Sequence, residues 1–270
     1  MKKAQYFYLL RRGFFSGGGV AFDSDYQAVL DFATDLEYDL PSTAQQELQN
    51  TLVTDLKTAG IWDNLDILYV FATDGDSNYA TLNWKSPNLY QATKNGIEGE
   101  PTHSVNGFTG LNGDQRYLDT NYNANTAPNA KFVNGNASAG VYIHTAVSST
   151  FNAQCYFGND DLGTTMRQGS TDKLQTKPIG VAGNSNNQLA YFTHNDSDES
   201  VQIWDTSVVA TNASEGTVAD RGNFAILAEG TSGSSTRYSN ATIGLFFLGA
   251  RIEDDQRTDL YNAINTYITG

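Results

Sequence analysis

Acidic side chains are the first residues to test for chemistry, because a glycoside hydrolase needs two carboxyl groups flanking the bond it cleaves. Two carboxylates at alternate positions of a strand would project from the same face. The nearest match is Asp196, Asp198 and Glu199, which lie in a polar Asn-Asp-Ser-Asp-Glu turn. A solvated turn explains this cluster better than an acid and base pair. We therefore expect that the protein is not an enzyme, with glycan cleavage as the least favoured alternative.

Asp74, Asp76 and Asn78 alternate after an apolar run, as the first three ligands of a calcium loop would. The glycine and the distal bidentate glutamate of an EF-hand are missing from this segment. We keep calcium as a weak candidate ligand of these three residues. We expect no other cofactor and no catalytic residue.

Aromatic side chains near polar turns are the remaining candidates for binding. Lectin-like sandwiches bind sugars by stacking an aromatic ring on a pyranose in a groove lined by loops. The candidates are Trp84, Tyr117, Tyr122 and Trp204. Packing in the core is the alternative for each of them.

The charge of the chain argues against a nucleic-acid partner. Sixteen basic and thirty acidic side chains give a net charge of −14, so neutralising phosphates with Lys and Arg could not drive binding. The first thirteen residues place basic side chains on both sides of a few apolar ones. We therefore expect neither a signal peptide nor a membrane span.

Residues 1–22 predict an arm that docks the protein onto a neighbouring subunit or pairs as a strand with its own domain. A glycine triplet near its end would act as a hinge. The single Cys155 lies in an apolar run and predicts a core thiol. The candidate assembly residues of the arm are Tyr6, Phe7, Tyr8, Arg11, Arg12, Phe14 and Phe15.

Residues 23–62 predict a helical hairpin, because apolar side chains recur there at helical spacing. Asp23 or Ser24 would cap the first helix, which is expected to extend to residue 40. Ser42 with Gln45 predicts a capping box that opens the second helix. The two apolar faces are expected to pack against each other or against the rest of the chain.

Residues 63–270 predict an antiparallel β-sandwich. Gly60 ends the second helix, and the apolar run 67–72 predicts the first strand. A closing helix is expected after a cap at Asp254 or Asp255. Further strands, separated by clusters of Gly, Asn, Asp and Ser, are expected at 81–85, 104–108, 117–120, 140–147, 153–158, 174–181, 189–194, 201–204, 223–228 and 243–248.

Two stretches of the chain carry a resemblance to a protein family. Residues 40–75 read LPSTAQQELQNTLVTDLKTAGIWDNLDILYVFATDG, and residues 223–268 read NFAILAEGTSGSSTRYSNATIGLFFLGARIEDDQRTDLYNAINTYI. Between them, GEPTHSVNGFTGLNGDQRYLDTNYNANT is a Gly-rich segment that leads into a strand. Together they resemble tail and other virion structural proteins of bacteriophages and prophages with a concanavalin A-like, laminin-G-like lectin sandwich. The resemblance covers residues 40–269 and implies a mainly β, concanavalin-like or jelly-roll fold.

The resemblance implies a structural component of a phage virion, in the tail, a fibre or the particle surface, made in the host cytoplasm. Its partners would be other virion proteins and further copies of itself. A bacterial surface glycan is a further candidate partner. The alternative is a carbohydrate-binding, lectin-like module or receptor-binding protein.

Overall fold

The computed structural model describes residues 21–97, 99–111, 115–133, 135–146, 155–159, 165–168, 173–176, 179–182, 185–194, 200–212, 222–230 and 238–270. Two groups of residues singled out in the sequence lie outside these ranges. They are the arm residues Tyr6, Phe7, Tyr8, Arg11, Arg12, Phe14 and Phe15, and the acidic turn with Asp196, Asp198 and Glu199.

Helices occur at the two ends of the described chain: α1 Ser24–Asp35, α2 Thr43–Thr58 and α3 Arg257–Thr269. Asp23 caps α1, because its Oδ1 accepts a hydrogen bond of 2.9 Å from the amide of Asp25. The helix ends before the expected residue 40, since Glu37 adopts a positive φ of 59°.

The start and end of α2 agree with the expectation from the sequence, but only one of the two hydrogen bonds of the expected capping box is present. Ser42 Oγ accepts a hydrogen bond of 3.3 Å from the amide of Gln45. The Gln45 side chain does not reach back to Ser42 but donates to the hydroxyl of Tyr267 on α3, at 2.7 Å. Gly60 ends the helix with a φ of 69°, a conformation that glycine adopts without strain.

The described strands form two antiparallel sheets. Sheet A has eight strands in the order β13-β12-β11-β6-β15-β4-β3, with β1 paired to β15, and sheet B has seven in the order β10-β9-β8-β7-β14-β5-β2. The strand bounds are β1 Leu65–Val70, β2 Thr93–Asn95, β3 Thr102–Ser104, β4 Gly107–Thr109, β5 Tyr117–Asp119, β6 Ala137–Thr145, β7 Cys155–Gly158, β8 Thr165–Gln168, β9 Lys173–Thr176, β10 Ile179–Ala182, β11 Gln188–His194, β12 Ser200–Trp204, β13 Ser207–Asn212, β14 Ala225–Ile226 and β15 Thr242–Gly249.

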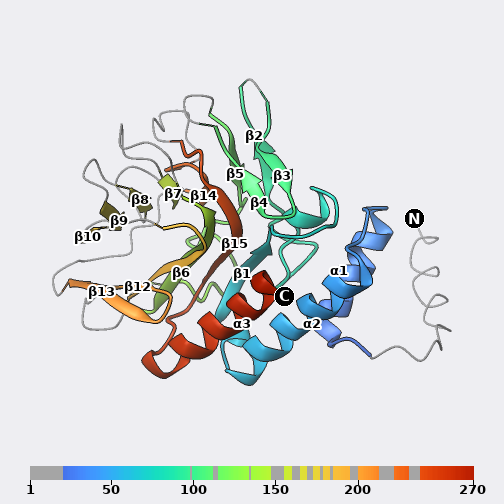
Figure 1. Ribbon diagram of the computed structural model, residues 1–270, viewed down its shortest axis with the longest axis horizontal. Coiled ribbons are helices and arrows are strands. Elements are labelled where there is room, and N and C mark those ends of the chain that lie inside the picture. The colour runs from blue at the N-terminus through green and yellow to red at the C-terminus, as the bar shows by residue number, and fades with distance from the viewer. Residues whose placement is uncertain are drawn as a thin grey trace.

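Sheet A lies between sheet B and a layer of helices (Figure 1). Alternate side chains of its central strands face opposite layers. On β15, Phe246 packs into the core shared with sheet B, while Leu245 and Phe247 pack toward the helices. The expected sandwich is confirmed, and the two expected helices pack against it as part of a third layer.

The core between the sheets is rich in aromatic rings. Phe157 of β7 packs edge-on against Phe246 of β15, with ring centroids 5.3 Å apart. Phe224 and Phe132 meet in the same way at 5.4 Å. Cys155 is fully buried, which confirms the expected core thiol.

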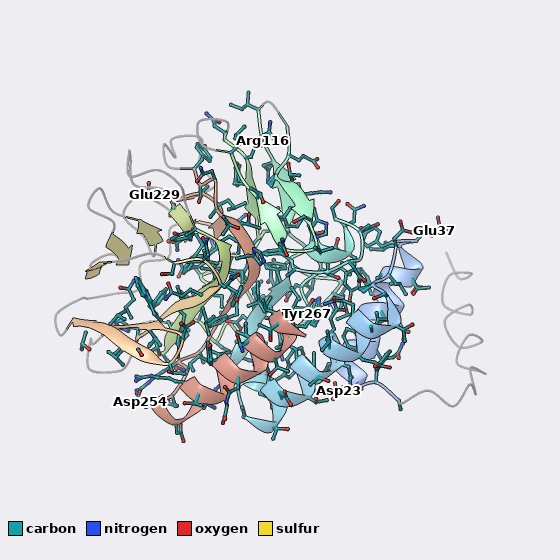
Figure 2. All side chains as sticks on the ribbon, viewed as in Figure 1. Asp23, Glu37, Arg116, Glu229, Asp254 and Tyr267 are labelled. Atoms are coloured by element: carbon teal, nitrogen blue, oxygen red, sulfur yellow. The ribbon has the colours of Figure 1, made fainter. Side chains whose placement is uncertain are left out.

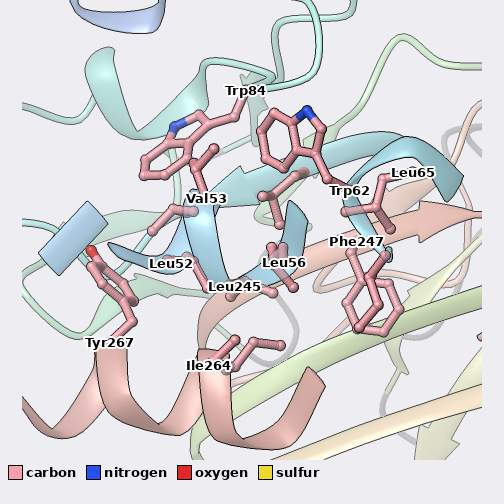
Figure 3. Close-up of a cluster of buried hydrophobic side chains, with 14 of the residues drawn as sticks. Leu52, Val53, Leu56, Trp62, Leu65, Trp84, Leu245, Phe247, Ile264 and Tyr267 are labelled. Carbon is pink, nitrogen blue, oxygen red and sulfur yellow. The ribbon is translucent and has the colours of Figure 1, made fainter. Parts of the chain in front are cut away.

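The helical layer covers sheet A with a second apolar core (Figure 3). Helix α2 lies beside α3, and the two helices carry their buried side chains onto the central strands of the sheet (Figure 1). The labelled members of this core are Leu52, Val53, Leu56, Trp62, Leu65, Trp84, Leu245, Phe247, Ile264 and Tyr267.

One polar side chain, Gln49 of α2, lies fully buried inside this apolar layer. Its Oε1 accepts hydrogen bonds from the hydroxyls of Tyr26, at 2.7 Å, and Tyr79, at 2.8 Å. Its Nε2 donates to Thr73 Oγ1 at 3.1 Å and to the Tyr267 hydroxyl at 3.2 Å. Gln49 therefore joins α1, α3 and the segment after β1 through a satisfied network.

The expected strand at 81–85 is wrong. A 3₁₀ turn, Tyr79–Thr81, occupies its start, and the rest is irregular. Asn83 explains the difference, because its Oδ1 accepts from the amide of Leu68 on β1 at 3.1 Å. A buried side chain thus takes the place of a strand's carbonyl beside β1.

Two other expected strands are each divided between two antiparallel strands. Residues 104–108 contain the turn between β3 and β4, where Gly107 has a φ of 113° and a Cβ would lie 2.0 Å from the carbonyl oxygen of Ile243. Residues 174–181 are divided between β9 and β10. The turn in residues 104–108 falls at Val105 and Asn106, and the Asn-Gly pair at 106–107 is a turn signal that the prediction missed.

Replacing Gln49 with leucine tests the buried network. The substitution leaves the hydroxyls of Tyr26 and Tyr79 buried without an acceptor, so we expect the free energy of unfolding to fall by about 2 to 4 kcal/mol. Urea denaturation measures this change. The matched control is Gln27→Leu on the exposed side of α1, for which we expect a change within about 0.5 kcal/mol. Equal effects of the two substitutions would contradict the importance of the network.

Candidate functional site

Two of the four aromatic residues proposed to bind sugar belong to the core, which corrects that expectation. Trp84 is 1% exposed and packs against Tyr26 in the helical layer, with ring centroids 5.5 Å apart. Tyr122 is 2% exposed, and its hydroxyl donates to Asp66 Oδ2 at 2.9 Å. Neither ring presents a face to solvent, so neither can stack on a sugar in this conformation.

Trp204 is half-buried at the end of β12. Its ring packs against the core between the sheets, and its Nε1 has no hydrogen-bond partner among the described residues. The structure therefore places Trp204 apart from the other candidate aromatic residues, at the margin of the sandwich core.

Tyr117 lies on the outer side of sheet B, where it meets a second tyrosine. On β5 the central Leu118 is buried between the sheets, and the half-buried Tyr117 and Asp119 flank it. Because side chains alternate along a strand, both flanking residues face outward. The ring of Tyr117 lies 6.2 Å from that of Tyr238, centroid to centroid, over a small apolar cluster with Ala225 and Ala228.

Polar groups surround Asp119 on the same surface. Its Oδ1 accepts from the amide of Asn121 at 2.7 Å and from Asn223 Nδ2 at 3.2 Å. Asn121, with a φ of 55°, also donates its Nδ2 to the backbone oxygen of Gln91 and to Thr93 Oγ1, both at 2.8 Å. These bonds fix the direction of the carboxylate and of the amide beside it.

Burial raises the pKa of the Asp119 carboxyl, and the hydrogen bonds from Asn121 and Asn223 offset only part of this shift. Burial and then the charge of Asp119 raise the pKa of the Tyr117 hydroxyl. At neutral pH the surface therefore presents an incompletely hydrated carboxylate next to an un-ionised phenol. Such a pair can accept and donate hydrogen bonds to the hydroxyl groups of a ligand.

We call this surface, formed by Tyr117, Tyr238, Asp119, Asn121 and Asn223, the tyrosine surface. An aromatic ring beside planar carboxylate and amide groups is suited to a ligand with one apolar face and a rim of hydroxyls. Of these five residues, only Tyr117 was predicted from the sequence as a binding residue. The alternation of residues 117–119 could also have indicated Asp119, but Asn223 and Tyr238 reach this surface only through long-range strand pairing.

The three calcium candidates already serve as hydrogen-bond acceptors. Asp76 Oδ1 accepts from the amides of Asn78 and Tyr79, both at 2.7 Å, and Asp74 Oδ1 accepts from the amide of Ser42 at 3.1 Å. The Nζ of Lys94 lies 3.0 Å from Asn78 Oδ1. A positive ammonium at the third candidate ligand disfavours a cation there. Nowhere in the described ranges do three or more His, Cys, Asp or Glu side chains gather as a metal site would need.

No protein-family model matches this sequence, and no curated protein matches it. A structure of botulinum neurotoxin type C, whose cell entry depends upon interaction with two ganglioside molecules, is 13% identical, with a TM-score of 0.50 over 77% of this chain and 53% of that chain. Domain 4 of an extracellular GH43 arabinanase from Geobacillus stearothermophilus, in complex with arabinotriose, is 12% identical, with a TM-score of 0.44 over 73% of this chain and 98% of that chain. A mutant Trypanosoma rangeli sialidase displaying trans-sialidase activity is 13% identical, with a TM-score of 0.48 over 83% of this chain and 40% of that chain.

The fold is a lectin-like β-sandwich. This chain spans about half of the toxin structure and less of the sialidase, and it spans nearly all of the arabinanase domain. At such low identity the likeness concerns the fold alone. The role in a phage virion, with other virion proteins and further copies of the chain as partners, stays a prediction. No helix in the described part of the chain has the length and apolar character to cross a membrane.

Replacing Asp76 with alanine tests whether this loop is a structural element. The substitution removes the acceptor of three backbone amides, those of Asn78, Tyr79 and Asp39, so we expect the free energy of unfolding to fall by about 1 to 2 kcal/mol. Thermal denaturation in EDTA and in millimolar calcium should show the same loss, and calcium should not raise the melting temperature of the unsubstituted protein. A stabilisation by calcium that disappears in the Asp76→Ala variant would contradict this interpretation.

Proposed function

We propose that this protein is a carbohydrate-binding, lectin-like module that binds a glycan at the tyrosine surface. The observation that carries the proposal is the placement of the half-buried Tyr117 ring beside Asp119 on the outer side of β5. A pyranose has an apolar face that stacks on an aromatic ring and hydroxyls that pair with carboxylate and amide groups.

Preorganisation of the polar groups supports the proposal. Asn121 is held by its own amide bonds to Gln91 and Thr93, and Asp119 is held by Asn121 and Asn223. Groups that are already oriented lose little conformational freedom when a ligand binds. The carboxylate of Asp119 is also poorly hydrated, as its raised pKa indicates, so a sugar hydroxyl replaces little water there.

The proposal is for binding without cleavage. The groups that bond to Asp119 are the backbone amide of Asn121 and the side-chain amide of Asn223, neither of which is an acid. Hydrolysis of a glycosidic bond would need a second carboxyl group roughly 5 to 10 Å from the first, on the other side of the scissile bond. Product release from a bound polysaccharide, abolished by substitution of Asp119, would replace this proposal with a hydrolase.

A glycan array with the full chain identifies the ligand, and variants then test the surface. For the best glycan, we expect Tyr117→Ala to weaken binding by about tenfold, the loss of a stacking contact worth ~1.4 kcal/mol. Calorimetric titration measures the affinity. The matched control is Tyr261→Ala on α3, in the helical layer, which should bind as the unsubstituted protein does. An array without binding, or equal affinities of the two variants, would contradict the proposal.

Acid should weaken glycan binding through Asp119. Protonation removes the charged acceptor, and because burial raises the pKa of this carboxyl, the loss should begin above the ordinary aspartate value of 3.8 as the pH falls from about 7. Affinities measured across this pH range give the transition. The Asp119→Asn variant should bind more weakly at about pH 7 and lack the acid transition. An identical pH profile in the variant would exclude Asp119 as the titrating group.

A further inference from the structure

A hollow of about 220 Å³ opens on the helical side of sheet A, away from the tyrosine surface. Its floor is a row of side chains across three strands, since Thr193 of β11 pairs with Val201 of β12, which pairs with Thr211 of β13. Val208 completes the floor. Helix α3 begins beside this row and runs away from it over the centre of the sheet (Figure 1).

Two arginines and an aspartate form the wall of the hollow. Arg251 follows β15, Asp254 begins the 3₁₀ turn Asp254–Gln256, and Arg257 opens α3. Figure 2 labels Asp254 at this end of α3. Arg257 forms an ion pair with Asp254, and Arg251 Nε lies 3.1 Å from Glu253 Oε2.

The arginines are buried much more deeply than their acidic partners. The side chain of Arg257 is 14% exposed and that of Arg251 is 29% exposed, whereas those of Asp254 and Glu253 are 72% and 52% exposed. The Nε atom of Arg257 is buried and has no hydrogen-bond partner in the described part of the chain, and the buried Nε of Arg251 has the Glu253 carboxylate beside it, 3.1 Å away. Each guanidinium group therefore has one acidic partner, and that partner lies mostly in solvent, where water weakens the pairing.

The other lining groups indicate what kind of anion would fit. Guanidinium groups match the planar geometry of a carboxylate. The Thr211 hydroxyl and the Asp254 carboxylate can pair with ligand hydroxyls, and Val201 and Val208 offer apolar contact. The volume is below the ~300 Å³ of common drug-sized sites, so the ligand would be about one ring in size.

We propose that this hollow binds a small hydroxylated carboxylic acid of the hexuronate type, with its carboxylate on Arg251 and Arg257. The ligand's carboxylate accepts hydrogen bonds from the guanidinium groups that line the hollow, and its hydroxyls contact Thr211 and Asp254. The site is independent of the tyrosine surface, because its floor lies on the opposite face of sheet A from sheet B.

Titration of the full chain with sodium glucuronate, followed by NMR of the arginine Nε–H groups and by calorimetry, tests the site. Glucose and acetate are the comparison probes. We expect glucuronate to bind, glucose to show no binding, and acetate to bind at least about tenfold more weakly than glucuronate. Binding of glucose at the affinity of glucuronate would overturn the role of the arginines. Equal binding of acetate would overturn the hydroxylated class of ligand.

Variants locate the binding. Arg257→Gln should weaken glucuronate binding by at least about tenfold, while Arg116→Gln, at the far end of the molecule in Figure 2, should not change it. Val208→Phe, at a position 47% exposed, should fill the hollow without disturbing the core, and it tests the site even if Arg257→Gln fails to fold. Glucuronate binding that survives the filled hollow would overturn the proposal.

The Tyr117→Ala variant separates this site from the proposed glycan surface. It should bind glucuronate as the unsubstituted protein does, whatever its effect on the glycan from the array. Loss of glucuronate binding in Tyr117→Ala, with retention in Arg257→Gln, would move the acid to the tyrosine surface and overturn the assignment to the hollow.

Discussion

Burial of sheet A on both faces is the constraint on which the rest of the structure depends. Its central strands cannot face water on either side, because one face carries the aromatic core shared with sheet B and the other carries an equally apolar set. A two-layer sandwich would leave that second set exposed. The helices at the two ends of the described chain therefore belong to one layer, which covers it.

Close packing in this layer also fixes details of the sheet. At Gly140 of β6, a Cβ atom would lie 2.3 Å from the Cβ of Tyr191 and 2.8 Å from the Phe247 ring, so only glycine fits between these neighbours. The layer is also the place where polar atoms are hardest to accommodate. Gln49 meets that requirement by bonding to Tyr26, Tyr79 and Tyr267 simultaneously, which sets the positions of α1 and α3 relative to α2.

The sequence predicted the features whose signals are local. The apolar runs of β1 and β15, the caps at Asp23 and Ser42 and the stop at Gly60 follow from neighbouring residues alone. Trp84 was misjudged because polar neighbours in the chain suggested exposure, whereas its position in space is set by Tyr26, far away in sequence. Tyr117 was identified, but Tyr238, which meets its ring, and Asn223, which bonds to Asp119, are more than a hundred residues away in sequence and are brought near β5 by the pairing of β14.

The same constraint determines where recognition can occur. Since helices cover the centre of sheet A, ligands are left with two kinds of surface: the outer side of sheet B and the part of sheet A beyond the start of α3. The first carries a tyrosine and a carboxylate at alternate positions of one strand, and the second carries two arginines, each paired with a more exposed acid. The helices cover the centre of sheet A and leave the part beyond the start of α3 uncovered. The hollow with the two arginines lies there, and the tyrosine surface lies on the outer side of sheet B.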